Sequence, residues 1–249
     1  MTLAWLGSQL SPLAPGFWLL VSVLLTALLY SVRDAIPLRW RQPVWLAHWL
    51  LLPYFGLLLG ALSPRLIGLA AIDWPASLGL GLGLLVGVAA LLVLVRAVID
   101  LGHPALNQQR PSSGEGAGPG DRSPEAPSGG WQVIGDAFLW SGATEFHWAF
   151  LRGALWEIYQ SPLLSLELPG YWAIWSAALI AAVEVSAARL GFIQWLLQVV
   201  TLITTSILFF YTQNFWLCWA LHMTVQSLGS PSTHLPRRWS SLFSDRGVE

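Results

Sequence analysis

Seven apolar stretches alternate with polar segments along this chain, and one of those polar segments is long. Most of the stretches approach the roughly 20 apolar residues that a helix needs to cross a bilayer. The expected helices cover residues 15–30, 43–62, 76–95, 131–160, 172–190, 194–211 and 215–228. The pattern therefore predicts an all-α, polytopic membrane protein with about seven transmembrane helices.

Composition agrees with a membrane protein. Hydrophobic residues make up 55% of the chain and charged residues 10%, and the mean hydropathy is +0.60. A soluble domain usually carries about 25% charged residues. Many of the 16 Trp lie near the ends of apolar stretches, as in an interfacial aromatic belt. The net charge of -1 gives no indication of nucleic-acid binding, and the single cysteine, Cys218, excludes an intramolecular disulfide.

One polar segment divides the chain into parts. Residues 107–130 are rich in Gly, Pro, Ser and Glu and contain no aromatic residue, so we expect a disordered linker. Residues 1–106 then hold three helices, residues 131–230 form a core of four helices, and residues 231–249 form a tail. The short loops of the core favour antiparallel neighbours.

The positions of the arginines predict the orientation. All 12 basic residues are Arg, and the seven-helix map puts ten of them on one side of the membrane. Arg65 alone falls on the other side, and Arg152 lies inside a helix. By the positive-inside rule, the N-terminus is outside, and the linker and the C-terminal tail are cytoplasmic. Because no basic residue precedes the first apolar stretch, we expect a retained helix rather than a secretory signal.

Two local features modify individual helices. Pro53 should kink the second helix. Gly79, Gly81, Gly83 and Gly87 in the third should let a neighbouring helix approach closely. The glycines resemble a GxGxxG fingerprint, but they lie inside an apolar stretch with no strand before it, which excludes a nucleotide-binding loop.

The fourth helix carries four ionisable side chains: Glu145, His147, Arg152 and Glu157. A central charge costs about 2.5–3.5 kcal/mol in a transmembrane helix, so such residues indicate a functional site or a paired polar seam. Helical spacing puts Glu145 and Arg152 on one stripe and points His147 away from Glu145. We expect Arg152 and Glu157 to form a structural polar pair.

Later helices offer partners at a similar depth. Glu184, His222 and Gln226 are the main candidates, and His222 and Gln226 lie one turn apart. A buried carboxylate is a suitable general base, and imidazole, amide and carboxylate groups can orient a water or hold a divalent metal. The candidate site is therefore Glu145, His147, Glu184, His222 and Gln226. We interpret His48 as a hydrogen-bonded packing residue.

Two segments resemble the CPBP family, the CAAX-protease and bacteriocin-processing group of intramembrane endopeptidases. The resemblance covers roughly residues 131–228. The family carries Glu-Glu-x-x-x-Arg, Phe-x-x-x-His and His-x-x-x-Asn/Asp motifs in successive membrane helices. The matching segments are FHWAFLRGALWE for the first motif and SILFFYTQNFWLCWALHMTVQ for the third, which includes Thr212, Asn214 and Trp216.

The resemblance implies roles for some residues, and the chain departs from the family at others. Counting back from Arg152, the paired glutamates fall on His147 and Trp148. Ile180-x-x-x-Glu184 stands where the second motif has its histidine. Glu145, two residues before the expected glutamate, would then be the base that activates water, with His147 and Glu184 as substituted partners. His222 and Gln226 would hold the oxyanion or a metal.

Three functions follow from these observations. The first is a divergent CPBP-type intramembrane protease in the plasma membrane of a prokaryote, acting on a peptide or prenylated protein at the lipid bilayer. The second is a non-catalytic relative that serves as a membrane scaffold or complex subunit. The third is a haem or quinone protein that uses pairs such as His48 and His222 as axial ligands.

Overall fold

A computed structural model describes residues 14–102, 130–162, 164, 166–188 and 190–229. The predicted tail, and the predicted linker apart from its last residue, lie outside these ranges. All regular secondary structure within them is α-helical, as predicted. The helices are α2 (Pro15–Ser31), α3 (Leu38–Leu58), α4 (Trp74–Gly102), α6 (Gly130–Tyr159), α7 (Pro169–Ala187), α8 (Phe192–Thr212) and α9 (Phe215–Gly229).

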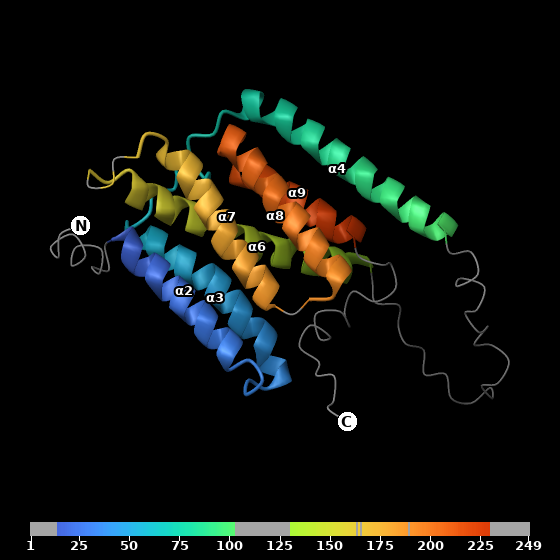
Figure 1. Cartoon of the computed structure of the whole chain (residues 1–249), viewed down its shortest axis with the longest axis horizontal. Helices are drawn as coiled ribbons and strands as arrows, with labels where there is room; N and C mark the ends of the chain where they lie inside the picture. Colours follow the sequence, from blue (N-terminus) through green and yellow to red (C-terminus); the bar gives the residue numbers. More distant parts are fainter. Residues whose placement is uncertain (1–13, 103–129, 163, 165, 189, 230–249) are drawn as a thin grey trace.

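Helix α6 is the central element of the fold (Figure 1). It packs against α2 and α3, which also pack against each other, and against α7 and α9. Helix α8 packs on α7 and α9, while α4 lies at the edge of the molecule along α9 and α8. Side chains on different faces of α6 therefore meet different groups of helices.

Three of the described helices are long and apolar enough to cross a membrane: α4, α7 and α8. Helices α2 and α9 are shorter, with 17 and 15 residues. Helix α6 is long enough, with 30 residues, but it carries the charged side chains described above. Length and composition thus support a membrane protein with three candidate spans among the described helices, and the seven spans and their orientation stay a prediction.

Local sequence explains several helix ends. Proline occupies the first turn of α2 and α7, where its missing N–H costs nothing. Asn214 caps α9, because its Oδ1 accepts hydrogen bonds from the backbone N–H groups of Trp216 and Leu217 at 3.0 and 3.3 Å. Gly68, with a φ of +77°, leaves no room for a Cβ beside the chain at Gln213. These contacts fix the start of α9, the helix that carries His222.

Two expectations about individual helices need correction. The second helix begins at Leu38 rather than Pro43, so both Pro43 and Pro53 lie inside it. In α4, a Cβ on Gly81 would collide with Leu217 of α9, whereas a Cβ on Gly79, Gly83 or Gly87 would meet no atom of the described residues within 4 Å. Residues two apart do not share a face of a helix with 3.6 residues per turn. Only Gly81 therefore serves the close approach that was expected of all four glycines.

Candidate functional site

The polar side chains of α6 divide into two groups. Glu145 and His147 are two residues apart, so they point about 200° away from each other around the helix. Glu145 meets α9, and His147 meets α7 and α3. Four of the five residues expected in one site therefore form two separate pairs, Glu145 with His222 and His147 with Glu184, and the fifth, Gln226, lies with His222.

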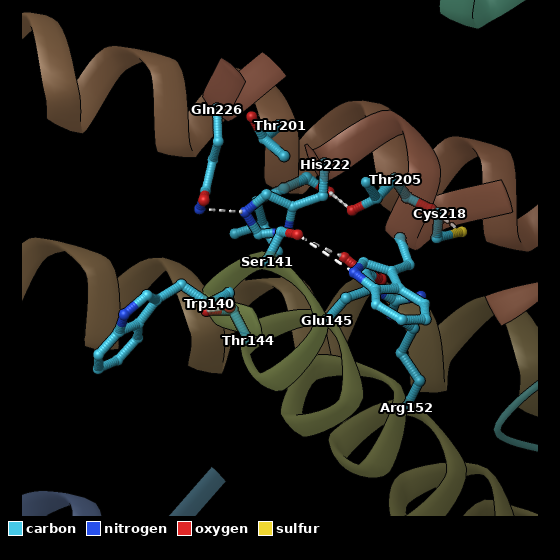
Figure 2. Close-up of polar contacts among 12 residues, drawn as sticks. Trp140, Ser141, Thr144, Glu145, Arg152, Thr201, Thr205, Cys218, His222 and Gln226 are labelled. Atoms are coloured by element: carbon cyan, nitrogen blue, oxygen red, sulfur yellow. Dashed lines mark hydrogen bonds and ion pairs between the residues drawn. The ribbon is translucent and has the colours of Figure 1, made fainter. Parts of the chain in front are cut away.

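The first group is the Glu145 cluster, which comprises Glu145, Arg152, His222 and Gln226. Arg152 Nη2 donates to Glu145 Oε1 at 2.5 Å, and His222 Nδ1 lies 3.4 Å from Glu145 Oε2. The Arg152 guanidinium also lies 4.7 Å from the ring centre of Phe209. Both carboxylate oxygens of Glu145 thus face cationic or N–H groups, as Figure 2 shows for these side chains of α6 and α9.

His222 is held on three sides. Its Nε2 lies 3.1 Å from the amide nitrogen of Gln226, and its ring stacks on Trp148 with centres 5.1 Å apart. Nε2 of a neutral imidazole accepts from the amide, so the hydrogen lies on Nδ1 and points toward Glu145 Oε2, although neither of these two atoms has a hydrogen-bond partner among the described residues. Glu145 and His222 are 0% exposed and Arg152 is 1% exposed. Glu145, Arg152 and His222 are therefore closed to solvent and balanced in charge, while Gln226 is half-buried at the edge of the cluster.

The second group is the His147 cluster, which comprises Thr26, His48, His147 and Glu184. His147 Nε2 lies 3.1 Å from Glu184 Oε2 and 3.3 Å from Oε1. On the other side, the His147 and His48 ring centres are 5.4 Å apart, and His48 Nε2 lies 2.8 Å from Thr26 Oγ1. Two polar contacts and the ring contact between the two imidazoles thus join α7, α6, α3 and α2.

The His147 cluster differs from the first in the exposure of its carboxylate. The Glu184 side chain is 13% exposed, and that of His147 is 1% exposed. Tyr30 Oη donates to the backbone oxygen of Glu184 at 2.9 Å and ties α2 to α7 at this point. The Nδ1 atoms of His147 and His48 are buried and have no hydrogen-bond partner among the described residues. The cluster thus has two buried imidazole nitrogens without hydrogen-bond partners among the described residues, and one carboxylate, that of Glu184, which is partly exposed.

Several predicted contacts are replaced by others. Arg152 pairs with Glu145 rather than with Glu157, because residues seven apart share a helix face and residues five apart do not. His48 contacts His147, and His222 contacts Glu145, so these contacts give no support to His48 and His222 as axial ligands. Among the described residues, no group of three or more His, Cys, Asp and Glu side chains could hold a metal ion. The divalent metal considered above therefore has no such ligand set there.

Sequence reasoning missed the part played by His48 and Thr26. The only sequence signal for His48 was its position within an apolar helix. A histidine in such a helix is more often a packing residue than a catalytic one. Thr26 gave no signal, because single threonines are common in apolar helices. The packing of α2 and α3 against α6 brings them together.

The fold and the two clusters define an all-helical protein that has three candidate membrane spans and two buried imidazole–carboxylate pairs. Comparisons with protein-family models, with curated proteins and with solved structures find no match for this chain. Function must therefore be argued from the two clusters.

Proposed function

We propose that this protein is a divergent CPBP-type intramembrane protease whose reactive pair is His147 and Glu184. The contact that carries the proposal is the 3.1 Å approach of His147 Nε2 to the Glu184 carboxylate. The proposed reaction is hydrolysis of a peptide bond in a membrane-associated peptide or prenylated protein. All seven helices then lie in the plasma membrane of a prokaryote, with the N-terminus outside and the C-terminus in the cytoplasm.

The resemblance to the family supports this choice of pair. It puts the first motif's glutamate on His147 and the second motif's histidine on Glu184. The acid and the imidazole are thus exchanged between two helices, while their contact remains. An exchanged pair keeps one carboxylate, one imidazole and the hydrogen bond between them, which are the groups that acid–base chemistry requires.

Within this pair, His147 is the base. Glu184 accepts a hydrogen bond from Nε2–H and fixes that tautomer, so the lone pair lies on Nδ1. Nδ1 has no other partner among the described residues and can take a proton from a water molecule. Glu184 also stabilises the imidazolium that forms, as the carboxylate does in other acid–imidazole pairs. The Glu184 side chain is partly exposed, which gives a proton from the imidazolium a route to solvent.

Glu145, the base expected from the sequence, has a supporting role in this proposal. One of its oxygens is held by Arg152 and the other faces His222. Protonation of this carboxylate would remove the charge that balances the buried Arg152 cation. The Glu145 cluster therefore holds α6 and α9 together and keeps His222 and Gln226 in place.

Replacement of the proposed base and its partner tests the function. The protein is reconstituted into liposomes and given internally quenched hydrophobic peptides, with and without a C-terminal prenyl group. His147→Gln and Glu184→Gln should each lower the rate of hydrolysis at least about 10²-fold. That factor is the smallest rate enhancement typical of a general base. Thr204→Val is the matched control, because the Thr204 hydroxyl donates only within α8, to Val200. Full activity in both variants would reject the assignment.

A non-catalytic scaffold is the second candidate, and one contact favours it. Trp148 stands at the position of the family's second glutamate and stacks on His222, so an indole fills space beside that imidazole. A scaffold predicts that purified wild-type protein hydrolyses none of these peptides. It also predicts that His147→Gln preserves whatever complex the protein forms.

A further inference from the structure

The connection between α2 and α3 is a basic end of the molecule that neither cluster uses. Arg33 lies in the connection, and Arg39 and Arg41 lie among the first four residues of α3. Asp34 is the only carboxylate between residues 31 and 41. We call residues 31–41 the arginine turn, which carries three arginines, one aspartate and therefore a formal charge of +2.

Local contacts hold the arginine turn in one shape. The backbone N–H of Ile36 donates to the carbonyl oxygen of Val32 at 3.2 Å, and Arg41 Nε donates to the carbonyl oxygen of Ile36 at 2.9 Å. The Ile36 side chain packs against a buried cluster that includes Trp45 and Trp140. A turn that is already fixed loses little conformational freedom when it binds a ligand, which favours binding.

Much of the positive charge of the arginine turn is open to a partner. Arg33 Nε approaches Asp34 Oδ1 at 3.4 Å, and the Asp34 side chain is largely exposed, so this ion pair is weak in water. Arg39 is exposed and forms no ion pair within the part of the chain that the structure describes. An anionic group at the turn would therefore compete with one exposed carboxylate only within residues 31–41.

The other end of α3 lacks this excess of positive charge (Figure 1). Residues 59–73, which join α3 to α4, contain one arginine, Arg65, and one aspartate, Asp73. Residues 160–168, which join α6 to α7, contain Glu167 and no basic residue. The charge is thus unequal at the two ends of the helices, which is complementary to a bilayer with an anionic surface on one side.

Exposed apolar side chains continue directly from the arginine turn. Leu38 and Trp40 are 54% and 53% exposed at the start of α3, and Leu24 and Leu28 are exposed on α2. A soluble anion would meet the arginines alone. A phospholipid offers an anionic headgroup to the arginines and acyl chains to the leucines, while tryptophan is typical of the interface between the two. The combination fits a lipid better than a soluble anion.

We propose that the arginine turn binds the headgroups of anionic phospholipids, with their acyl chains along the exposed leucines of α2 and α3. Arg39 supplies an exposed charge, and Arg33 exchanges its weak contact with Asp34 for the lipid phosphate. Because Ile36 packs against the buried cluster, bound headgroups also stabilise the packing of α2 and α3 on α6. This binding uses an exposed surface and is independent of the hydrolysis proposed above.

Lipid retention and thermal unfolding test the proposal. In nanodiscs with equal parts of phosphatidylglycerol and phosphatidylcholine, the wild-type protein should unfold at a higher temperature than in phosphatidylcholine alone. Native mass spectrometry should show that it retains phosphatidylglycerol in preference. Arg39→Gln should lower that preference about fivefold, the contribution of one arginine near an anionic lipid, and Arg39→Lys should keep most of it.

Arg65→Gln is the matched control, because Arg65 is an exposed arginine at the other end of α3. It should keep the wild-type preference, and Arg33→Gln provides a second variant of the arginine turn if Arg39→Gln fails to fold. Equal retention of the two lipids by the wild-type protein would overturn the proposal. An equal loss of preference in Arg65→Gln and in the variants of the turn would also overturn it.

A further comparison separates a lipid headgroup from a soluble phosphate. Inorganic phosphate or glycerol phosphate, added to the protein in phosphatidylcholine nanodiscs, should leave the unfolding temperature unchanged. A shift as large as that with phosphatidylglycerol would mean that the turn binds a soluble anion, and the assignment to lipid would be wrong. High salt should reduce the preference for phosphatidylglycerol, because it screens exposed charges. A preference that salt leaves unchanged would contradict recognition by the arginines.

Discussion

Helix α6 has a carboxylate–imidazole pair on each of two faces, and the two pairs differ in how completely they are neutralised. In the Glu145 cluster, arginine and histidine both face one carboxylate, and these three side chains are closed to solvent. In the His147 cluster, the carboxylate has an imidazole partner and a partly exposed side chain. A buried arginine–carboxylate pair stabilises a fold, whereas a partly exposed carboxylate that contacts an imidazole is suited to proton transfer.

The largest expected effect is loss of the Glu145–Arg152 ion pair. Arg152→Met leaves a buried carboxylate without its cation and should lower the free energy of unfolding by about 3–5 kcal/mol. Thermal unfolding in detergent measures the change. The double variant Arg152→Met with Glu145→Gln removes both charges and should recover much of that loss. A double variant as unstable as the single one would contradict the charge-pair explanation.

A smaller effect is expected at His222, where stacking and polar contacts add up. His222→Phe keeps the aromatic stack on Trp148 but removes the contact with Glu145 and one contact of Gln226. Unpaired buried polar groups cost about 1–3 kcal/mol, so the variant should be destabilised by about that amount. The same unfolding assay checks this, and a neutral His222→Phe would mean that stacking alone holds α9 at this point.

On the other face, Glu184→Gln should separate stability from activity. The amide can still accept a hydrogen bond from His147, so the free energy of unfolding should change by about 1 kcal/mol or less. Activity should fall far more than stability in the liposome assay. A destabilisation as large as that of Arg152→Met would show that the two clusters are both structural.

The smallest effect is expected at Glu157, which the sequence paired with Arg152. Because Arg152 instead binds Glu145, Glu157→Gln should change the free energy of unfolding by no more than about 0.5 kcal/mol. A loss comparable to that of Arg152→Met would mean that Glu157 also neutralises the guanidinium.

The sequence predicted helices better than it predicted partners. Apolar stretches marked all seven described helices, since each must bury an apolar face or meet lipid. The common stripe of Glu145 and Arg152 followed from helical spacing within one element. By contrast, the pairing of His147 with His48 depends on how α3 packs against α6, which no spacing within one helix determines. The start of α3 was misplaced because Pro43 was taken as the first helical residue, whereas the helix begins at Leu38 and contains Pro43.

The most direct test compares hydrolysis by His147→Gln and Glu145→Gln in liposomes, with rates expressed per folded molecule. The two substitutions remove one polar group each from opposite faces of the same helix. The expected result is a loss of at least about 10²-fold for His147→Gln, with the folded fraction of Glu145→Gln keeping a rate within about tenfold of wild type. Loss of activity in Glu145→Gln with retention in His147→Gln would contradict the assignment of the reactive pair.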